Sequence, residues 1–188
     1  AQMDAGVRAS DLGYVETHGT ATPLGDPIEV QALNDAFVSN GGNPGCVIGS
    51  VKSNFGHVTA AAGVAGLIKA TLIVNKGVIP PTLHFRKPNP AIAWEQTPFR
   101  VNATTENWSS SGPRLAGVSS FGVGGTNAHV IVAQPPQVQP SGVARPWQLL
   151  PLSHQSVEGL ERQEAALLQA LPQQTSLADV AFTLQTGR

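Results

Sequence analysis

Apolar positions in the first part of the chain alternate between short continuous runs and a longer stretch with helical spacing. Residues 13–17 and 46–51 are short apolar runs bounded by loops, which predicts two buried strands. Between them, apolar residues from 28 to 37 recur with a mostly helical period. Asp26 followed by Pro27 is typical of a helix N-cap and the first helical position. This part of the chain therefore predicts a strand, a helix and a second strand.

The most apolar helix is predicted from about residue 58 to residue 74, and its first turns are rich in small residues. Alanine and glycine fill nearly every position from 60 to 66, so the helix backbone can approach its neighbours closely. We expect this helix to pack centrally between layers. Its N-terminus directs a partial positive charge toward the preceding loop, residues 52–57, and this favours negative charge there.

Further along the chain, the pattern is mainly extended. Residues 78–85 are predicted to be extended because two consecutive prolines forbid a helix. Residues 99–102 predict a short strand, and the runs 115–120 and 128–133 predict two strands joined by a glycine-rich turn. A strand and helix repeated twice and then followed by a β-hairpin predicts a mixed α/β layer structure.

The composition changes between residues 134 and 146, where proline, glutamine, serine and glycine dominate and predict a linker. A second small unit follows. Residues 147–152 predict a strand, Ser156 is expected to cap a helix, and Ser176 is expected to cap a last helix that runs through Leu184. This unit is too small to be stable alone, so we expect it to pack against another part of the protein.

Composition and charge exclude several classes of function. The chain has 188 residues, of which 41% are hydrophobic and 12% charged, and its formal net charge is −1, unlike a basic nucleic-acid binder. A single cysteine excludes an internal disulfide framework and fits a reducing compartment. The longest run without a polar side chain, residues 60–68, is too short to span a membrane, and no signal-peptide pattern opens the chain. A cytoplasmic location without a membrane partner is therefore expected.

Two histidines carry the strongest chemical signal. His18 and His57 each follow a predicted strand, in a short loop of small residues. In α/β folds, chemistry is commonly placed at such strand ends, because a rigid sheet positions the loops. Two neutral imidazole N–H donors near hydroxyls and a lysine suit a developing enolate or oxyanion on a thioester carbonyl. The alternative is that each histidine only caps a helix or fills a pocket.

Other chemistries fit the sequence less well. The histidines at 18, 57, 84 and 129 show no metal-ligand spacing, and there is no cysteine pair, so no metal is expected. The segment 117–121 is not a G-x-S-x-G nucleophile elbow, and 122–127 is not a G-x-G-x-x-G dinucleotide motif. We expect His129 to be a structural hydrogen-bonding residue rather than a base.

Several long motifs resemble one family, in the same order along the chain. They are His-Gly-Thr-Ala-Thr at 18–22, Gly-Asp-Pro at 25–27, Lys-Ser-Asn-Phe-Gly-His at 52–57, Ala-Ala-Ala-Gly at 60–63 and Gly-Val-Ser-Ser-Phe-Gly-Val-Gly-Gly-Thr-Asn-Ala-His at 117–129. Together they resemble the β-ketoacyl synthase domains of modular (type I) polyketide synthases. The resemblance covers residues 1–135, the C-terminal half of such a domain. Residues 136–188 resemble a proline-rich connector and the start of the linker domain that leads from a ketosynthase to an acyltransferase.

The resemblance implies a fold, a reaction and partners. The fold is the thiolase-like α/β type, followed by a small α/β linker unit. The reaction is polyketide chain elongation, in which an acyl chain condenses with a decarboxylated malonyl-type extender in a Claisen reaction. The implied partners are the N-terminal half of the ketosynthase domain, an acyl carrier protein, a second copy in a homodimer, and a neighbouring acyltransferase or linker domain. No cofactor bound by the domain is implied, because the substrates travel on the phosphopantetheine arm of the carrier protein.

The family's site residues carry over onto individual positions. His18 and His57 match the two catalytic histidines that hold the extender's thioester carbonyl, and Lys52 matches the catalytic lysine. Thr20 and Thr22 match the hydroxyls that hold the phosphopantetheine arm. Two further positions complete the predicted substrate-binding set: Phe121, which matches an aromatic gate, and Asn127, which is expected to fix the glycine-rich turn or touch substrate.

Three departures from the family pattern matter. The nucleophilic cysteine is absent, and Cys46 is not expected to replace it, so we expect the chain alone to be inactive. Ala21 stands where the family usually has glycine, and its methyl group narrows the predicted pantetheine path. Gly66 stands where simpler bacterial ketosynthases have a glutamate, so Lys52 needs another carboxylate. Glu16 is the predicted partner of Lys52, with an ordinary structural ion pair as the alternative.

A second function stays open at this point. A non-elongating ketosynthase, or a scaffold module, would bind carrier protein without condensing. Such relatives commonly lose the motif of the second histidine. His57 and its motif are present here, which favours the condensing function.

Overall fold

Five strands form one sheet in the order β4-β2-β1-β6-β7 in the computed structural model, which describes residues 1–42, 44–137, 142, 145–173 and 176–187. Strand β1 pairs in parallel with β2 and β6, β2 pairs in parallel with β4, and the hairpin partner β7 is antiparallel to β6. The strands are β1 Leu12–Glu16, β2 Cys46–Gly49, β4 Phe99–Val101, β6 Leu115–Phe121 and β7 Asn127–Ala133. A mostly parallel sheet agrees with the predicted α/β class.

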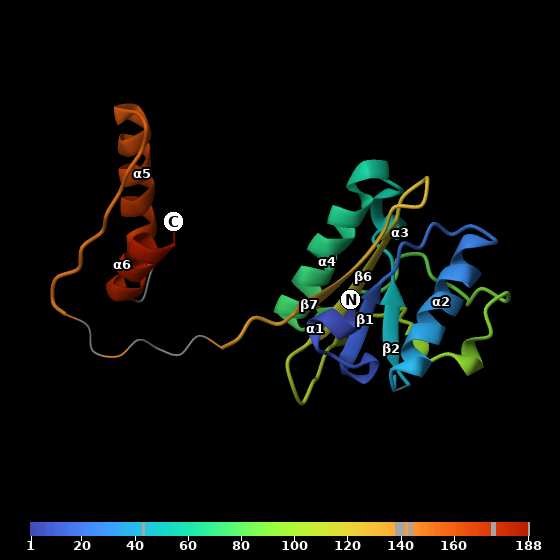
Figure 1. Cartoon of the computed structure of the whole chain (residues 1–188). Helices are drawn as coiled ribbons and strands as arrows, with labels where there is room; N and C mark the ends of the chain where they lie inside the picture. The colour runs from blue at the N-terminus through green and yellow to red at the C-terminus, as the bar shows by residue number, and fades with distance from the viewer. Residues whose placement is uncertain (43, 138–141, 143–144, 174–175, 188) are drawn as a thin grey trace. The chain divides into compact units, whose positions relative to one another are not determined.

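Two helices cover opposite faces of this sheet, α2 (Gly25–Ser39) on one side and α4 (Ala62–Lys76) on the other (Figure 1). Buried apolar side chains on the α2 side are Leu12, Val15, Val30, Leu33, Phe37, Cys46, Ile48, Phe99 and Leu115. Those on the α4 side are Tyr14, Val47, Ala70, Ile73, Val74, Ala116 and Val118. Successive residues of β2 and β6 alternate between the two cores, as side chains do along a strand.

Shorter elements connect these layers. They are α1 (Gln2–Ala5), α3 (Lys52–Phe55), the short pair β3 (Val78–Ile79) with β5 (Glu106–Asn107), and 3-10 turns at Ala9–Asp11, Thr59–Ala61 and Trp94–Gln96. The segment 52–57, predicted as a loop, begins with the helical turn α3. The small-residue helix begins at Ala62, later than predicted, after a 3-10 turn. Two-residue strands such as β5 leave no periodic signal in a sequence.

The start of α2 differs from the prediction. The helix begins at Gly25, so Asp26 lies inside its first turn and is not the N-cap. The Asp26 carboxylate instead accepts the backbone N–H of Ala21 at 3.0 Å, and the hydroxyl of Thr22 accepts that of Gly25 at 3.0 Å. The polar residues before this helix therefore fix the loop that follows β1.

The chain divides into two units, Ala1–Pro136 and Gln137–Arg188. The second contains α5 (Val157–Ala170), a 3-10 turn at Leu171–Gln173 and α6 (Leu177–Thr186). Both predicted caps are confirmed, because the Ser156 and Ser176 hydroxyls accept the N–H groups of Gly159 and Asp179. The strand predicted at 147–152 is wrong, since these residues are irregular. Part of the predicted linker, residues 138–141 and 143–144, lies outside the described residues.

Within the described parts of the chain, none of the helices combines the length and apolar character needed to cross a membrane.

Candidate functional site

The two histidines singled out in the sequence lie together. Their ring centroids are 5.4 Å apart and the ring planes meet at 85°. His18 follows the end of β1, and His57 follows the α3 turn at the end of β2. Because β1 and β2 are parallel neighbours, their C-terminal ends open at the same edge of the sheet. The 39-residue separation in sequence is closed by this pairing.

The surroundings keep both imidazoles suited to donating hydrogen bonds. Burial, then the positive charge of Lys52 and the proximity of His57, lower the pKa of His18. His57 Nδ1 accepts the backbone N–H of Thr59 at 3.1 Å, so the neutral ring carries its proton on Nε2. His18 Nδ1 is buried and has no hydrogen-bond partner among the described residues. Such an unpaired ring nitrogen can bind a group that this chain does not itself provide.

Lys52 is a half-buried cation close to both histidine loops. Burial lowers the pKa of Lys52, and the charges of Glu16 and Glu29 partly oppose this. Its ammonium has no ion pair within 4.0 Å among the residues that the structure describes. Lys52 therefore influences its neighbours through charge at a distance.

Glu16 makes its ion pair with a different lysine from the one predicted. Its Oε2 lies 2.9 Å from Nζ of Lys69 on α4, and Glu16 itself is 1% exposed. Its Oε1 accepts the backbone N–H of Val51, next to Lys52 in the chain. Glu16 thus contacts the backbone next to Lys52 and acts on the Lys52 ammonium only through its charge.

Glu29 is a residue that the sequence analysis missed. Its carboxylate, in the second turn of α2, accepts the backbone N–H groups of His18 at 2.7 Å and Gly19 at 2.9 Å. Burial raises the pKa of Glu29, and the two N–H donors counteract part of that rise. Its position could have been noticed in the sequence, because the helical period places this carboxylate on the face of the helix that is predicted to be buried. Glu29 holds the loop that carries His18.

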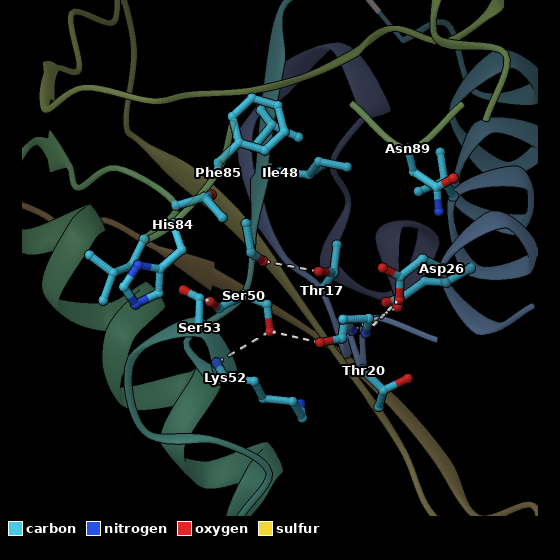
Figure 2. A pocket seen from close by; sticks show the side chains of 18 of the residues that line it. Thr17, Thr20, Asp26, Ile48, Ser50, Lys52, Ser53, His84, Phe85 and Asn89 are labelled. Atoms are coloured by element: carbon cyan, nitrogen blue, oxygen red, sulfur yellow. Dashed lines mark hydrogen bonds between the residues drawn. The ribbon is translucent and has the colours of Figure 1, made fainter. Parts of the chain in front are cut away.

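A cavity of about 450 Å³ opens beside these loops (Figure 2). Lys52, Ser53 and His84 lie at one side of it and Asp26 and Asn89 at the other. Its lining also includes Gly19, Thr20, Ala21, Ser50 and His57. It combines polar groups near the histidines with apolar walls, as ligand cavities generally do.

The other predicted binding residues are placed less uniformly. Thr20 lines the cavity, and Phe121 lies with its ring centroid 5.5 Å from that of His18. Thr22 does not line the cavity and is exposed. Asn127 is exposed and pairs with Phe121 across the base of the β6–β7 turn. The structure therefore brings His18, His57, Thr20 and Phe121 together with Lys52 and leaves Thr22 and Asn127 at the periphery.

Two remaining predictions concern the cysteine and His129. Cys46 is 4% exposed at the start of β2, and burial raises its pKa to about 12, so its thiol stays protonated. His129 Nδ1 lies 2.9 Å from the hydroxyl of Ser119, its partner across the β6–β7 hairpin. Among the described residues, no group of three or more histidine, cysteine, aspartate or glutamate side chains is placed to hold a metal ion.

Comparison with known families matches nearly the whole chain, in two parts. Residues 1–86 match the family described as "Beta-ketoacyl synthase, C-terminal domain". Residues 88–188 match the family described as "Ketoacyl-synthetase C-terminal extension".

Individual relatives agree with this assignment. The chain is 46% identical to one polypeptide of the phenolphthiocerol/phthiocerol polyketide synthase of Mycobacterium tuberculosis, over 98% of this chain and 13% of that protein. It is 45% identical to the erythronolide synthase EryA3 of Saccharopolyspora erythraea, over 97% of this chain and 6% of that protein. The solved ketosynthase from module 1 of the bacillaene synthase of Bacillus amyloliquefaciens matches with a TM-score of 0.72 at 37% identity, covering 100% of this chain and 34% of that one. The chain therefore spans a small part of these polyketide synthases and about a third of a solved ketosynthase.

Proposed function

Since this chain belongs to the β-ketoacyl synthase family, as a C-terminal domain followed by the C-terminal extension, we propose that it contributes the decarboxylating half of a ketosynthase site in polyketide chain elongation. The single observation that carries this proposal is the meeting of His18 and His57, whose ring centroids are 5.4 Å apart. His57 lines the cavity, and His18 adjoins it through its neighbours Thr17 and Gly19, which line it. The substrate would be a malonyl-type thioester on the phosphopantetheine arm of an acyl carrier protein.

The proposed first step is decarboxylation. The bond between the extender's carboxylate carbon and its α-carbon breaks, carbon dioxide leaves, and the electron pair forms an enolate whose negative charge lies on the thioester oxygen. N–H groups of His18 and His57 donate hydrogen bonds to that oxygen. Neutral imidazoles suit this role, and the lowered pKa of His18 is consistent with it. Preorganised donors aimed at a developing oxyanion are the largest single contribution in many such sites.

The second step joins two carbons. The α-carbon of the enolate attacks the carbonyl carbon of an acyl thioester held on a cysteine, a new carbon–carbon bond forms, and the cysteine leaves as a thiolate. Cys46 cannot provide this thiolate, because it is buried and its pKa is about 12. We therefore propose that an N-terminal ketosynthase half provides the nucleophile.

Exposed apolar residues near the histidines support the proposal that another part of the ketosynthase packs on this surface. Phe55 is 57% exposed beside the site, and Val123 at the tip of the β6–β7 turn is fully exposed. On α4, the outward-facing Val64, Ile68 and Leu72 are each more than half exposed. An apolar helix face of this kind is typical of a buried interface. We propose that the N-terminal half covers it.

The test is a decarboxylation assay on the domain assembled from this chain and an N-terminal ketosynthase half. Carbon dioxide release from malonyl-carrier protein and formation of the condensed product are measured separately. Replacing His18 or His57 with alanine is expected to lower kcat for carbon dioxide release by about 10²–10³. The matched control is His154→Ala, which removes a histidine from the second unit and should leave the rate unchanged.

The same assay distinguishes the alternative function. A scaffold module would bind carrier protein but release no carbon dioxide, even with both halves present. Condensation by this chain with no second polypeptide would contradict the proposed division of the site.

A further inference from the structure

We propose that Tyr14, Glu16 and Lys69 form a buried set of positioning residues that fixes the turn carrying Lys52, an inference that rests on the proposed function of that turn. The three come from two elements, β1 and α4, that are far apart in sequence. None of them lies on the loops that carry the histidines.

Glu16 is the centre of the set. Its Oε2 accepts the hydroxyl of Tyr14 at 2.5 Å and pairs with Lys69 at 2.9 Å, while its Oε1 accepts the N–H of Val51. Tyr14 and Glu16 are each 1% exposed, and the Lys69 side chain is 14% exposed. A buried carboxylate is stable only when it is paired and hydrogen-bonded. The contacts of Glu16 with Tyr14, Lys69 and Val51 together compensate for the burial of its charge.

The space for this carboxylate is provided by a glycine on α4. A Cβ atom added at Gly66 would lie 3.0 Å from Cγ of Glu16 and 3.8 Å from its Oε1. A larger side chain at Gly66 would therefore compete with Glu16 for the same volume. Lys69 lies one helical turn further along, and its ammonium also lies 5.5 Å from the centroid of the Tyr14 ring. Helix α4 thus provides both the space for the Glu16 carboxylate, at Gly66, and its counter-ion, Lys69.

The bond to Val51 connects this set to the site. Val51 is the N-cap residue of α3, and Lys52 is the first residue of that turn. The hydroxyl of Ser50 also accepts the N–H of Lys52 at 3.4 Å, but that bond is longer and partly exposed. Glu16 therefore makes the short, buried contact that sets where α3 begins. A small displacement of a positioned group can change a rate about 10²-fold.

The first test uses the 188-residue chain and needs no enzymatic reaction. Hydrogen exchange of the Val51 amide is compared in the wild type, in Lys69→Met and in the control Lys76→Met, which removes an exposed lysine from the same helix. We expect Val51 exchange to become at least tenfold faster in Lys69→Met and to stay unchanged in Lys76→Met. Equal exchange rates in all three proteins would overturn the inference.

The second test uses the assembled domain and the decarboxylation assay. Lys69→Met is expected to lower kcat by about tenfold or more, with KM changed less than twofold, because the set acts on the placement of Lys52 and not on substrate affinity. A change confined to KM would contradict the inference.

A double variant separates positioning from simple loss of packing. In Glu16→Gln with Lys69→Met, the glutamine oxygen can still accept the Val51 N–H and no longer needs a counter-ion. We expect it to recover a large part of the kcat that Lys69→Met loses, whereas a purely structural role for Lys69 would make the double variant worse. No carbon dioxide release by the wild-type domain would refute the proposed function, and the amide-exchange test would still decide whether Lys69 holds the α3 turn.

Discussion

At the scale of single residues, three non-glycine positions hold left-handed backbone conformations near the site. These are Ala21 with φ 56°, Thr59 with φ 47° and His84 with φ 64°. Ala21 and His84 line the cavity, and the N–H of Thr59 is the group that His57 Nδ1 accepts. Such conformations cost of order 1–3 kcal/mol each and persist where surrounding contacts enforce them. The strain therefore lies on the segments that position the two histidines and border the cavity.

Ala21 provides a stability prediction. Ala21→Gly should stabilise the chain by about 0.5–1 kcal/mol, because glycine adopts a positive φ without the steric cost of a Cβ atom. Thermal unfolding should show a Tm higher by about 1–4 °C. The matched control is Ala32→Gly in the exposed middle of α2, which should destabilise by about 1 kcal/mol. Equal losses of stability in both variants would contradict the strain at Ala21.

Lys52 provides a pH prediction. Burial is the largest cause of the lowered pKa of His18, and the charge of Lys52 is the next. Lys52→Met should therefore raise the pKa of His18 while leaving it below its ordinary value of 6.5. NMR titration of the His18 ring protons measures this directly, with Lys87→Met as the control. An unchanged His18 pKa would show that Lys52 does not act on that ring.

The sign of the effect on stability follows from linkage. Because the pKa of His18 is lower in the folded chain than in the unfolded chain, the unfolded chain binds more protons as the pH falls below about 6.5. The folded state therefore loses stability from His18 as the pH falls through that range. Lys52→Met should reduce this loss.

At the scale of elements, the site is held by ties between segments distant in sequence. Glu29 on α2 holds the loop after β1, and the hydroxyl of Ser50 donates to the carbonyl of Gly19 at 3.4 Å. Glu16 on β1 reaches both Val51 and Lys69. Each tie crosses between elements, so the relative placement of the histidine loops depends on the sheet and both helices together.

Replacing Glu29 is the most direct test of these contacts between elements. Glu29→Gln replaces one acceptor oxygen with a donor that faces the N–H of His18 or Gly19, so one bond to the loop is lost. We expect a loss of about 1–3 kcal/mol in the free energy of unfolding. Urea denaturation measures it. Asp35→Asn, on the exposed side of the same helix, is the control and should change the stability by less than about 0.5 kcal/mol.

At the scale of the whole molecule, one face of α4 lacks a partner within the described residues. Val64 is 54% exposed, Ile68 57% and Leu72 51%, on the side of the helix away from the sheet. Inward-facing residues of the same helix, such as Ala70 and Ile73, are almost fully buried against the strands. A helix that is apolar on both sides is suited to lie between two layers. This arrangement supports the proposed assembly with an N-terminal half.

Ile68→Lys tests this assembly. It should leave the unfolding of the chain within about 0.5 kcal/mol, since the side chain is exposed, while weakening association with an N-terminal ketosynthase half by about 2 kcal/mol or more. Calorimetric titration of the two halves measures the Kd. Val38→Lys, at a position 68% exposed near the end of α2, is the control. Equal Kd values for the two variants would exclude the α4 face as the interface.

The sequence by itself determined the elements whose causes are local. The period of apolar residues predicted β1, β2, α2 and the β6–β7 hairpin, and short-range hydrogen bonding predicted the caps Ser156 and Ser176. It also indicated that His18 and His57 can converge, because each follows a predicted strand in a short loop. The parallel pairing of β1 and β2, which brings both loops to one edge, was shown by the structure. These predictions rest on interactions between residues close in the chain, or on the general geometry of parallel sheets.

Only the tertiary structure decided which charged group meets which. Glu16 pairs with Lys69 and bonds to Val51, which is 35 residues away, and Glu29 holds His18 from 11 residues away on a different element. The Asp26 carboxylate accepts the backbone N–H of Ala21 and does not cap its own helix. No pattern of spacing encodes such choices, because a buried carboxylate binds whichever donors the packed layers bring to it. The packing of α2 and α4 on the sheet therefore determined which charged groups of the site contact one another. Local sequence determined that the two histidines lie in loops that follow β1 and β2.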